Sequence, residues 1–146
     1  MGRRRLVLLA AALMAAPALS RDTVLHLPVA SVADKAYSQG KLDPAIALYF
    51  AGQKTPAIAA RLGDGVSNRK TSSVGKGDEE ACRWAMLSAM MALQQDAKSH
   101  GANAVVGIVS YYKKNEFRSA TEFECHAGGL MTGVALKGEY VRLGKR

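Results

Sequence analysis

Hydrophobic and polar positions along the first half of the chain follow a strand-like pattern. Residues 23–32 (TVLHLPVASV) and 45–51 (AIALYFA) are apolar and rich in β-branched side chains, so we predict a strand in each. A third strand is expected within 58–70, where glycines make the register uncertain. Polar, turn-rich residues 34–44 predict a loop.

The pattern changes to a helical period after residue 77. Apolar residues recur at spacings of three and four, which places them on one stripe: Cys82, Met86, Ala89, Leu93 and Ala97. Asp78 is a suitable N-cap, and Gly101 suits the left-handed position that follows a helix. The spacing predicts a helix from Glu79 to His100.

Strand-like periods return after the helix. Residues 104–112 are apolar on both faces, which is typical of a strand inside a sheet. Residues 119–127 alternate, so Glu122, Glu124 and His126 share the face opposite Cys125. Residues 130–143 supply a last strand or hairpin. The predicted fold class is α+β, with one long helix packed on an antiparallel or mixed β-sheet.

The first twenty residues are typical of an export signal. Arg3, Arg4 and Arg5 precede an apolar run, Leu6 to Ala16, that is too short to span a bilayer. Cleavage after Ser20 leaves a single domain, residues 21–146, without a transmembrane segment, and lowers the net charge of +8 by three. We expect a periplasmic or secreted protein.

The basic residues of the remaining chain do not indicate a nucleic-acid binder. They are spread singly or in pairs, such as Arg69-Lys70 and Lys113-Lys114, without the clustering and interleaved aromatics of such surfaces. A solvated, soluble surface is the interpretation we favour.

The two cysteines, Cys82 and Cys125, fall on the apolar sides of the predicted helix and strand. Both should therefore face the same packing interface, which in an exported protein favours a disulfide. The alternative is a reactive thiol. It would need an activating base, and His126 points to the other face of its strand.

Glycine motifs and catalytic templates give no enzyme class. Gly101 and Gly107 follow a helix, whereas phosphate loops precede one. The stretch SSVGKGDEE (72–80) lacks the first glycine and the final Ser or Thr of a P-loop. No G-x-S-x-G nucleophile motif occurs. We predict no catalytic residues and no cofactor.

A metal site is the alternative reading of the polar strand face. Glu122, Glu124 and His126 offer two oxygens and one nitrogen, and His26 or His100 could add a ligand. The same alternation is typical of the solvent face of a half-buried strand, which is the interpretation we favour because three ligands in line rarely converge on one ion.

One part of the chain resembles a known family. The stretch ALQQDAKSHGANAVVGI (92–108) is similar to the YbjQ-like family, whose members have a helix followed by a GANAVVG-type strand. The ending ECHAGGLMTGVALKG (124–138) also resembles the Rcs stress-sensor lipoproteins, whose related fold contains disulfides. The resemblance covers residues 74–137 and implies a YbjQ-like sandwich that tends to oligomerise. The family is loosely described as binding heavy metals.

These observations favour a non-catalytic exported binding or envelope-stress module, stabilised by one disulfide, that meets an envelope protein through an exposed strand face or edge. A homo-oligomer is compatible with this, and the alternative is a periplasmic metal-binding protein. Small exported chains of similar sequence are sometimes labelled as an excinuclease ATPase subunit. The missing P-loop and the export signal argue against that activity.

Overall fold

The protein's structure is a computed structural model that describes residues 11–12 and 21–144. The predicted export signal, apart from residues 11–12, and its cleavage site after Ser20 lie outside the described residues. In chain order, the elements are β1 (Asp22–Pro28), α1 (Ala30–Ser38), β2 (Ala47–Phe50), β3 (Ile58–Ser72), α2 (Asp78–Ser99), β4 (Ala104–Ser110), the 3-10 helix η1 (Tyr112–Lys114), β5 (Glu122–Gly128) and β6 (Met131–Leu143).

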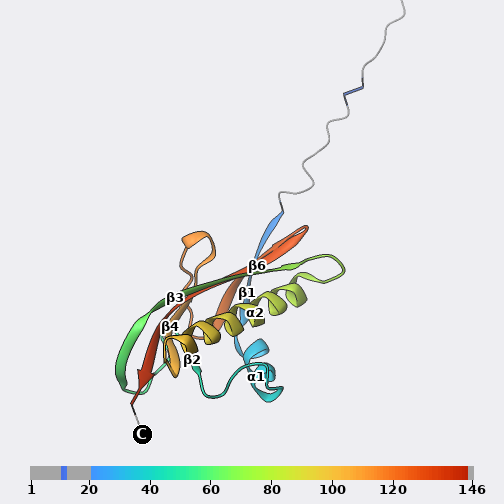
Figure 1. The fold of residues 1–146 in the computed structure, drawn as a ribbon. Helices are drawn as coiled ribbons and strands as arrows, with labels where there is room; N and C mark the ends of the chain where they lie inside the picture. The colour runs from blue at the N-terminus through green and yellow to red at the C-terminus, as the bar shows by residue number, and fades with distance from the viewer. Residues whose placement is uncertain (1–10, 13–20, 145–146) are drawn as a thin grey trace, which may run out of the picture.

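The six strands of the described residues form one mixed sheet around the long strand β6 (Figure 1). On one side, β6 pairs with β3 along its whole length. On the other side, the first part of β6 pairs with β5 and the second part with β4. β5 continues to β1, and β4 pairs in parallel with β2. Beside β6 the sheet therefore divides into two branches, β5–β1 and β4–β2.

The two helices cover one face of this sheet. α2 packs against β3 and β6, and α1 packs beside it (Figure 1). One cluster of buried apolar side chains fills the space between helices and sheet, with Met86, Leu93, Phe123, Leu136 and Tyr140 among its most buried members. None of the helices in the described part of the chain has the length and apolar character needed to cross a bilayer.

The predicted fold class, one long helix packed on a sheet, is wrong. The described chain is mainly sheet, with 43% strand and 27% helix, and the sheet curls like half of a barrel. A second helix, α1, occupies residues that we predicted as the end of a strand and a loop. Val29, Val32 and Ala36 recur at spacings of three and four and are buried, but this stripe is too short to stand out from the polar residues around it.

The other elements lie within or near their predicted ranges. α2 begins and ends one residue before the predicted bounds, and Gly77 rather than Asp78 is its N-cap. Gly101 adopts the predicted left-handed conformation, with a φ of 74°. Gly107 does so too, with a φ of 61°, where the pairing of β4 with β6 shifts register. Gly101 and Gly107, which resemble part of a phosphate-binding loop, are therefore explained by the left-handed backbone at these two positions.

Candidate binding site

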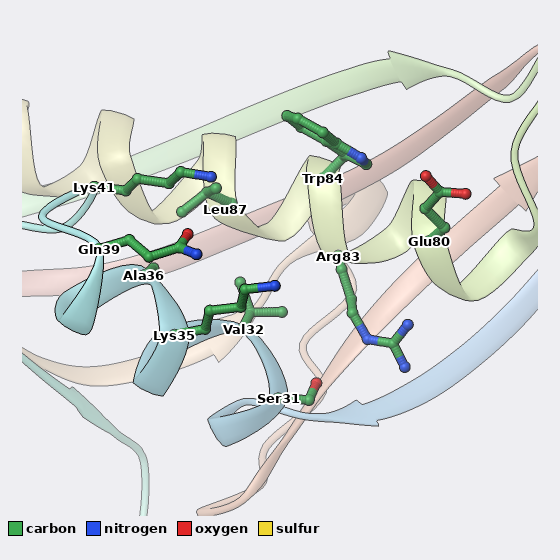
Figure 2. Close-up of a pocket in the computed structure, with 10 residues that line it drawn as sticks. All are labelled: Ser31, Val32, Lys35, Ala36, Gln39, Lys41, Glu80, Arg83, Trp84 and Leu87. Carbon is green, nitrogen blue, oxygen red and sulfur yellow. The ribbon is translucent and has the colours of Figure 1, made fainter.

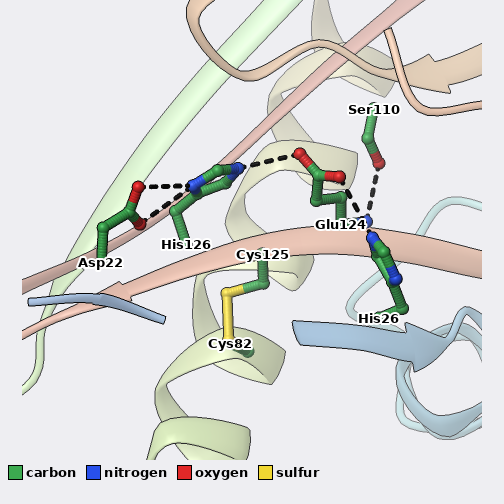
Figure 3. A network of polar contacts seen from close by, with 7 residues as sticks. All are labelled: Asp22, His26, Cys82, Ser110, Glu124, Cys125 and His126. Carbon is green, nitrogen blue, oxygen red and sulfur yellow. Dashed lines mark hydrogen bonds and ion pairs between the residues drawn. A yellow bond between two sulfur atoms is a disulfide. The ribbon is translucent and has the colours of Figure 1, made fainter. Parts of the chain in front are cut away.

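A network of two histidines and two carboxylates lies where β1 pairs with β5 (Figure 3). Antiparallel pairing sets His26 opposite Glu124, and the outward face of β5 adds His126 two residues on. The first residue of β1, Asp22, reaches the far side of His126. Four side chains from two strands thus form one continuous chain of polar contacts.

The contacts in this network are short. His126 Nδ1 lies 3.0 Å from Asp22 Oδ1, and His126 Nε2 lies 2.8 Å from Glu124 Oε1. The other oxygen of Glu124 lies 3.1 Å from His26 Nε2. Because ionised carboxylates only accept, both contacts of His126 are hydrogen bonds only when both of its ring nitrogens donate. The His126 ring therefore lies between two carboxylates, one at each ring nitrogen.

Glu124 is the centre of the network, and its side chain is 17% exposed. Burial by itself raises the pKa of Glu124, but hydrogen bonds from His126 and His26, together with their charge, outweigh that effect. The net result is a pKa below the ordinary value of a glutamate. The backbone N–H of Glu124 donates to Ser110 Oγ at 2.9 Å, which links the β5 branch to the β4 branch.

Aromatic rings cover both histidines. Tyr112 stacks on His126 with ring centroids 3.8 Å apart, and Phe117 stacks on His26 at 4.1 Å. Tyr112 opens η1, in which Lys113 has a φ of 50° and Lys114 a φ of 65°. Left-handed backbone at two successive lysines is strained, and such strain persists only where the surroundings hold it. Beside Tyr112 and His126 lies a cavity of about 340 Å³.

The predicted disulfide between Cys82 and Cys125 is confirmed, with 5.8 Å between the two Cα atoms. Both residues are fully buried. Cys125 points inward from β5 while its neighbours Glu124 and His126 point outward (Figure 3). The disulfide therefore attaches β5 to α2. The opposite face of β5 carries the two network residues Glu124 and His126.

The predicted metal ligands are only partly brought together. Glu124 and His126 are in contact, and His26 joins them, but among the described residues the Glu122 carboxylate has neither a hydrogen bond nor an ion pair. His100 lies at the end of α2, where its ring contacts Asp96 and Tyr140. Across residues 11–12 and 21–144, no group of three or more histidine, cysteine or acidic side chains could hold a metal ion. The geometry thus favours a polar tether between β1 and β5.

A second candidate site is a groove of about 290 Å³ between α1 and α2 (Figure 2). α1 contributes an apolar floor, Val32 and Ala36, and α2 contributes Leu87 and Trp84. Trp84 is the only tryptophan in the chain, and half of its surface is exposed. Because tryptophan has a large apolar surface and one N–H donor, a half-exposed ring beside a groove suits the binding of another molecule.

The rim of the groove is basic. Lys35, Lys41 and Arg83 line it together with one acid, Glu80. Arg83 is paired with Glu79, one turn away, at 3.1 Å. Lys35 and Lys41 have no ion pair among the described residues. Lys41 Nζ lies 6.0 Å from the centre of the Trp84 ring. A ligand with both an apolar and an acidic part matches this combination.

Sequence reasoning missed several residues of these two sites. Asp22 was left outside the predicted first strand, although it continues the alternation that includes His26. Trp84 lies off the apolar stripe of α2, and a large aromatic residue in that position is a signal that could have been used. The stacking partners Tyr112 and Phe117 come from a turn whose approach to β1 and β5 depends on the whole sheet.

Comparison with known proteins does not assign the chain to a family. No protein-family model and no curated protein matches the sequence. The resemblance to the YbjQ-like family over residues 74–137 therefore stays a prediction.

Proposed function

We propose that this protein is an exported, non-catalytic binding module, periplasmic or secreted and related to the YbjQ-like family. In this proposal the groove between α1 and α2 binds an acidic segment of an envelope protein. The observation on which it depends is the half-exposed Trp84 beside Lys41 on the groove rim.

Export is supported by the covalent state of the cysteines. Cys82 and Cys125 form a disulfide, and disulfides persist mainly in oxidising compartments such as the periplasm or the extracellular space. The N-terminal sequence, with its three arginines and apolar run, fits the same route. Fractionation of cells that express the full chain should place the protein outside the cytoplasm, with Arg21 as its first residue by mass spectrometry.

A non-catalytic role is supported by the partners of the polar network. Both ring nitrogens of His126 already face carboxylates, so neither is directed at a nucleophile. The Ser110 hydroxyl is buried and accepts a hydrogen bond from the backbone N–H of Glu124. Nucleophilic catalysis needs a base within hydrogen-bonding distance of an accessible hydroxyl or thiol.

A binding role for the groove is supported by its composition. Hot spots of protein interfaces are enriched in tryptophan and arginine that lie near apolar pockets. Trp84 and Arg83 are consecutive residues of α2, and both line the groove together with the apolar residues that α1 supplies. The cations on the rim favour an acidic partner over a basic one, mainly through faster association and selectivity.

The proposal is tested by selecting short random peptides, displayed on phage, on the purified exported protein. Selected sequences should combine acidic residues with an aromatic or aliphatic residue. Binding is then measured through the fluorescence of Trp84, which reports on the groove without ambiguity because the chain has no other tryptophan. A charge-reversed peptide, with lysine at the acidic positions, should leave the fluorescence unchanged.

Variant Lys41→Glu should weaken binding of the acidic peptide about fivefold or more. Lys54→Glu is the matched control, because it makes the same charge change at an exposed residue outside the groove. Selected peptides without acidic residues, or equal effects of the two variants, would contradict the proposal.

A further inference from the structure

Three large apolar side chains are exposed together at the end of the molecule where β1 begins. Val74 is 70% exposed, Leu130 is 57% exposed and Met131 is 50% exposed. Val74 lies in the loop between β3 and α2, and the other two lie at the turn and the start of β6. We call these three residues the apolar tip.

Backbone pairing brings the two parts of the tip together. Ser72 and Met131 are opposite each other in the β3–β6 ladder, and the N–H of Ser73 donates to the carbonyl of Leu130 at 2.8 Å. Figure 1 shows the start of β1, the β5–β6 turn and the β3–α2 loop at one end of the molecule, opposite the C-terminus. The residues of the apolar tip therefore lie on adjoining segments at one end of the molecule.

Cations surround the apolar tip. Arg21 and Lys113 line the same cavity as Leu130 and Met131. Lys76 belongs to the loop that holds Val74, and its Nζ donates to the carbonyl of Ser72 at 3.1 Å. Asp78 pairs with Arg21 and neutralises it, Asp22 contacts His126, and Glu79 pairs with Arg83. Lys76 and Lys113 are the cations beside the tip that have no ion pair among the described residues.

We propose that the apolar tip inserts into the surface of an anionic lipid bilayer. Exposed apolar side chains beside lysines are a combination that binds peripheral proteins to such surfaces. The apolar groups enter the boundary between headgroups and acyl chains, and the cations attract anionic headgroups.

The test is sedimentation of the exported protein with vesicles of phosphatidylglycerol and phosphatidylcholine, compared with vesicles of phosphatidylcholine alone. Binding is expected to the anionic vesicles, to fall as salt is raised, and to be at least about tenfold weaker for Val74→Asp, which puts a charge on the inserted surface. Val66→Asp is the matched control. It makes the same substitution at a valine that is 55% exposed on β3, opposite Lys137 and six residues from Ser72.

Leu130→Asp supplies a second variant on the other part of the tip, and circular dichroism checks that each variant is folded. Failure of the exported protein to sediment with anionic vesicles would overturn the proposal. So would equal binding by the Val74→Asp and Val66→Asp variants. Lys41→Glu, the groove variant, should sediment like the unmodified protein, so this result is independent of peptide binding.

Discussion

The phenol of Tyr140 on β6 lies directly over Gly65 on β3. A Cβ atom built on Gly65 would be 1.7 Å from Tyr140 Oη and 2.1 Å from Cζ. Tyr140 is fully buried, and its hydroxyl donates to Asp96 on α2. Because Gly65 has no side chain, the Tyr140 ring fits over β3, and its hydroxyl reaches Asp96 on α2.

Replacing Gly65 with alanine should therefore destabilise the protein by about 1–3 kcal/mol, the usual range for overpacking a filled interior. To avoid the new Cβ, the Tyr140 ring would have to leave its buried position and lose its hydrogen bond to Asp96. Urea unfolding followed by circular dichroism measures the effect. Gly144→Ala is the control, because its nearest contact, at 3.5 Å, is an ordinary one, and it should change stability by less than about 0.5 kcal/mol.

Tyr140→Phe should cost about 1 kcal/mol at neutral pH, the usual net value of one hydrogen bond. Burial, and then the hydrogen bond to Asp96, raise the pKa of Tyr140 well above its ordinary value of 10.0. Above that value the unfolded chain loses a proton that the folded protein keeps, so stability falls as pH rises. Urea unfolding across about pH 8 to about pH 11 should show a shallower fall for Tyr140→Phe. A slope equal to that of the unmodified protein would contradict this assignment.

Removing the disulfide should weaken the fold considerably. The bond closes a loop over a sequence separation of 43 residues, for which the chain-entropy account gives about 4 kcal/mol. Cys82→Ala with Cys125→Ala should lower the free energy of unfolding by about 2–5 kcal/mol, and reduction of the unmodified protein should approach the same value. Alkylation before and after reduction, followed by mass spectrometry, counts the free thiols. Two alkylated cysteines in unreduced protein would show that the bond does not form.

The sequence predicts α2 well and α1 not at all, for a physical reason. α2 has six turns, so its stripe repeats from Cys82 to Ala97 and ends at a glycine with left-handed backbone. α1 has nine residues, of which only Val32 and Ala36 are buried, and helices that short are stabilised by packing rather than by their own pattern. The curl and the branching of the sheet likewise depend on pairings between distant segments.

The candidate sites show the same limit. Alternation along β5 predicts that Glu124 and His126 share an outward face. It cannot supply Asp22 and His26, because their approach depends on the register between β1 and β5, which lie about a hundred residues apart in the chain. The groove depends on α1, so it could not be predicted from a pattern that missed this helix.

The polar network predicts a pH dependence with a definite sign. The net pKa of Glu124 is below its ordinary value of 4.5, so the folded protein holds the ionised form more strongly than the unfolded chain does. The contribution of the ionised Glu124 carboxylate is present above about pH 5 and is lost as pH falls through the folded-state pKa of Glu124. Glu124→Gln keeps the shape but removes the charge, and it should cost about 1–2 kcal/mol near neutral pH.

Glu122→Gln is the matched control for this prediction. It makes the same substitution on the same face of the same strand, but the Glu122 carboxylate has no polar partner among the described residues. Urea unfolding at a series of pH values should give Glu122→Gln the profile of the unmodified protein. The profile of Glu124→Gln should converge on it only below about pH 4, where the carboxyl is protonated. If both variants cost the same at neutral pH, the contacts of Glu124 with His126 and His26 do not stabilise the fold, and the network is not what holds β1 to β5.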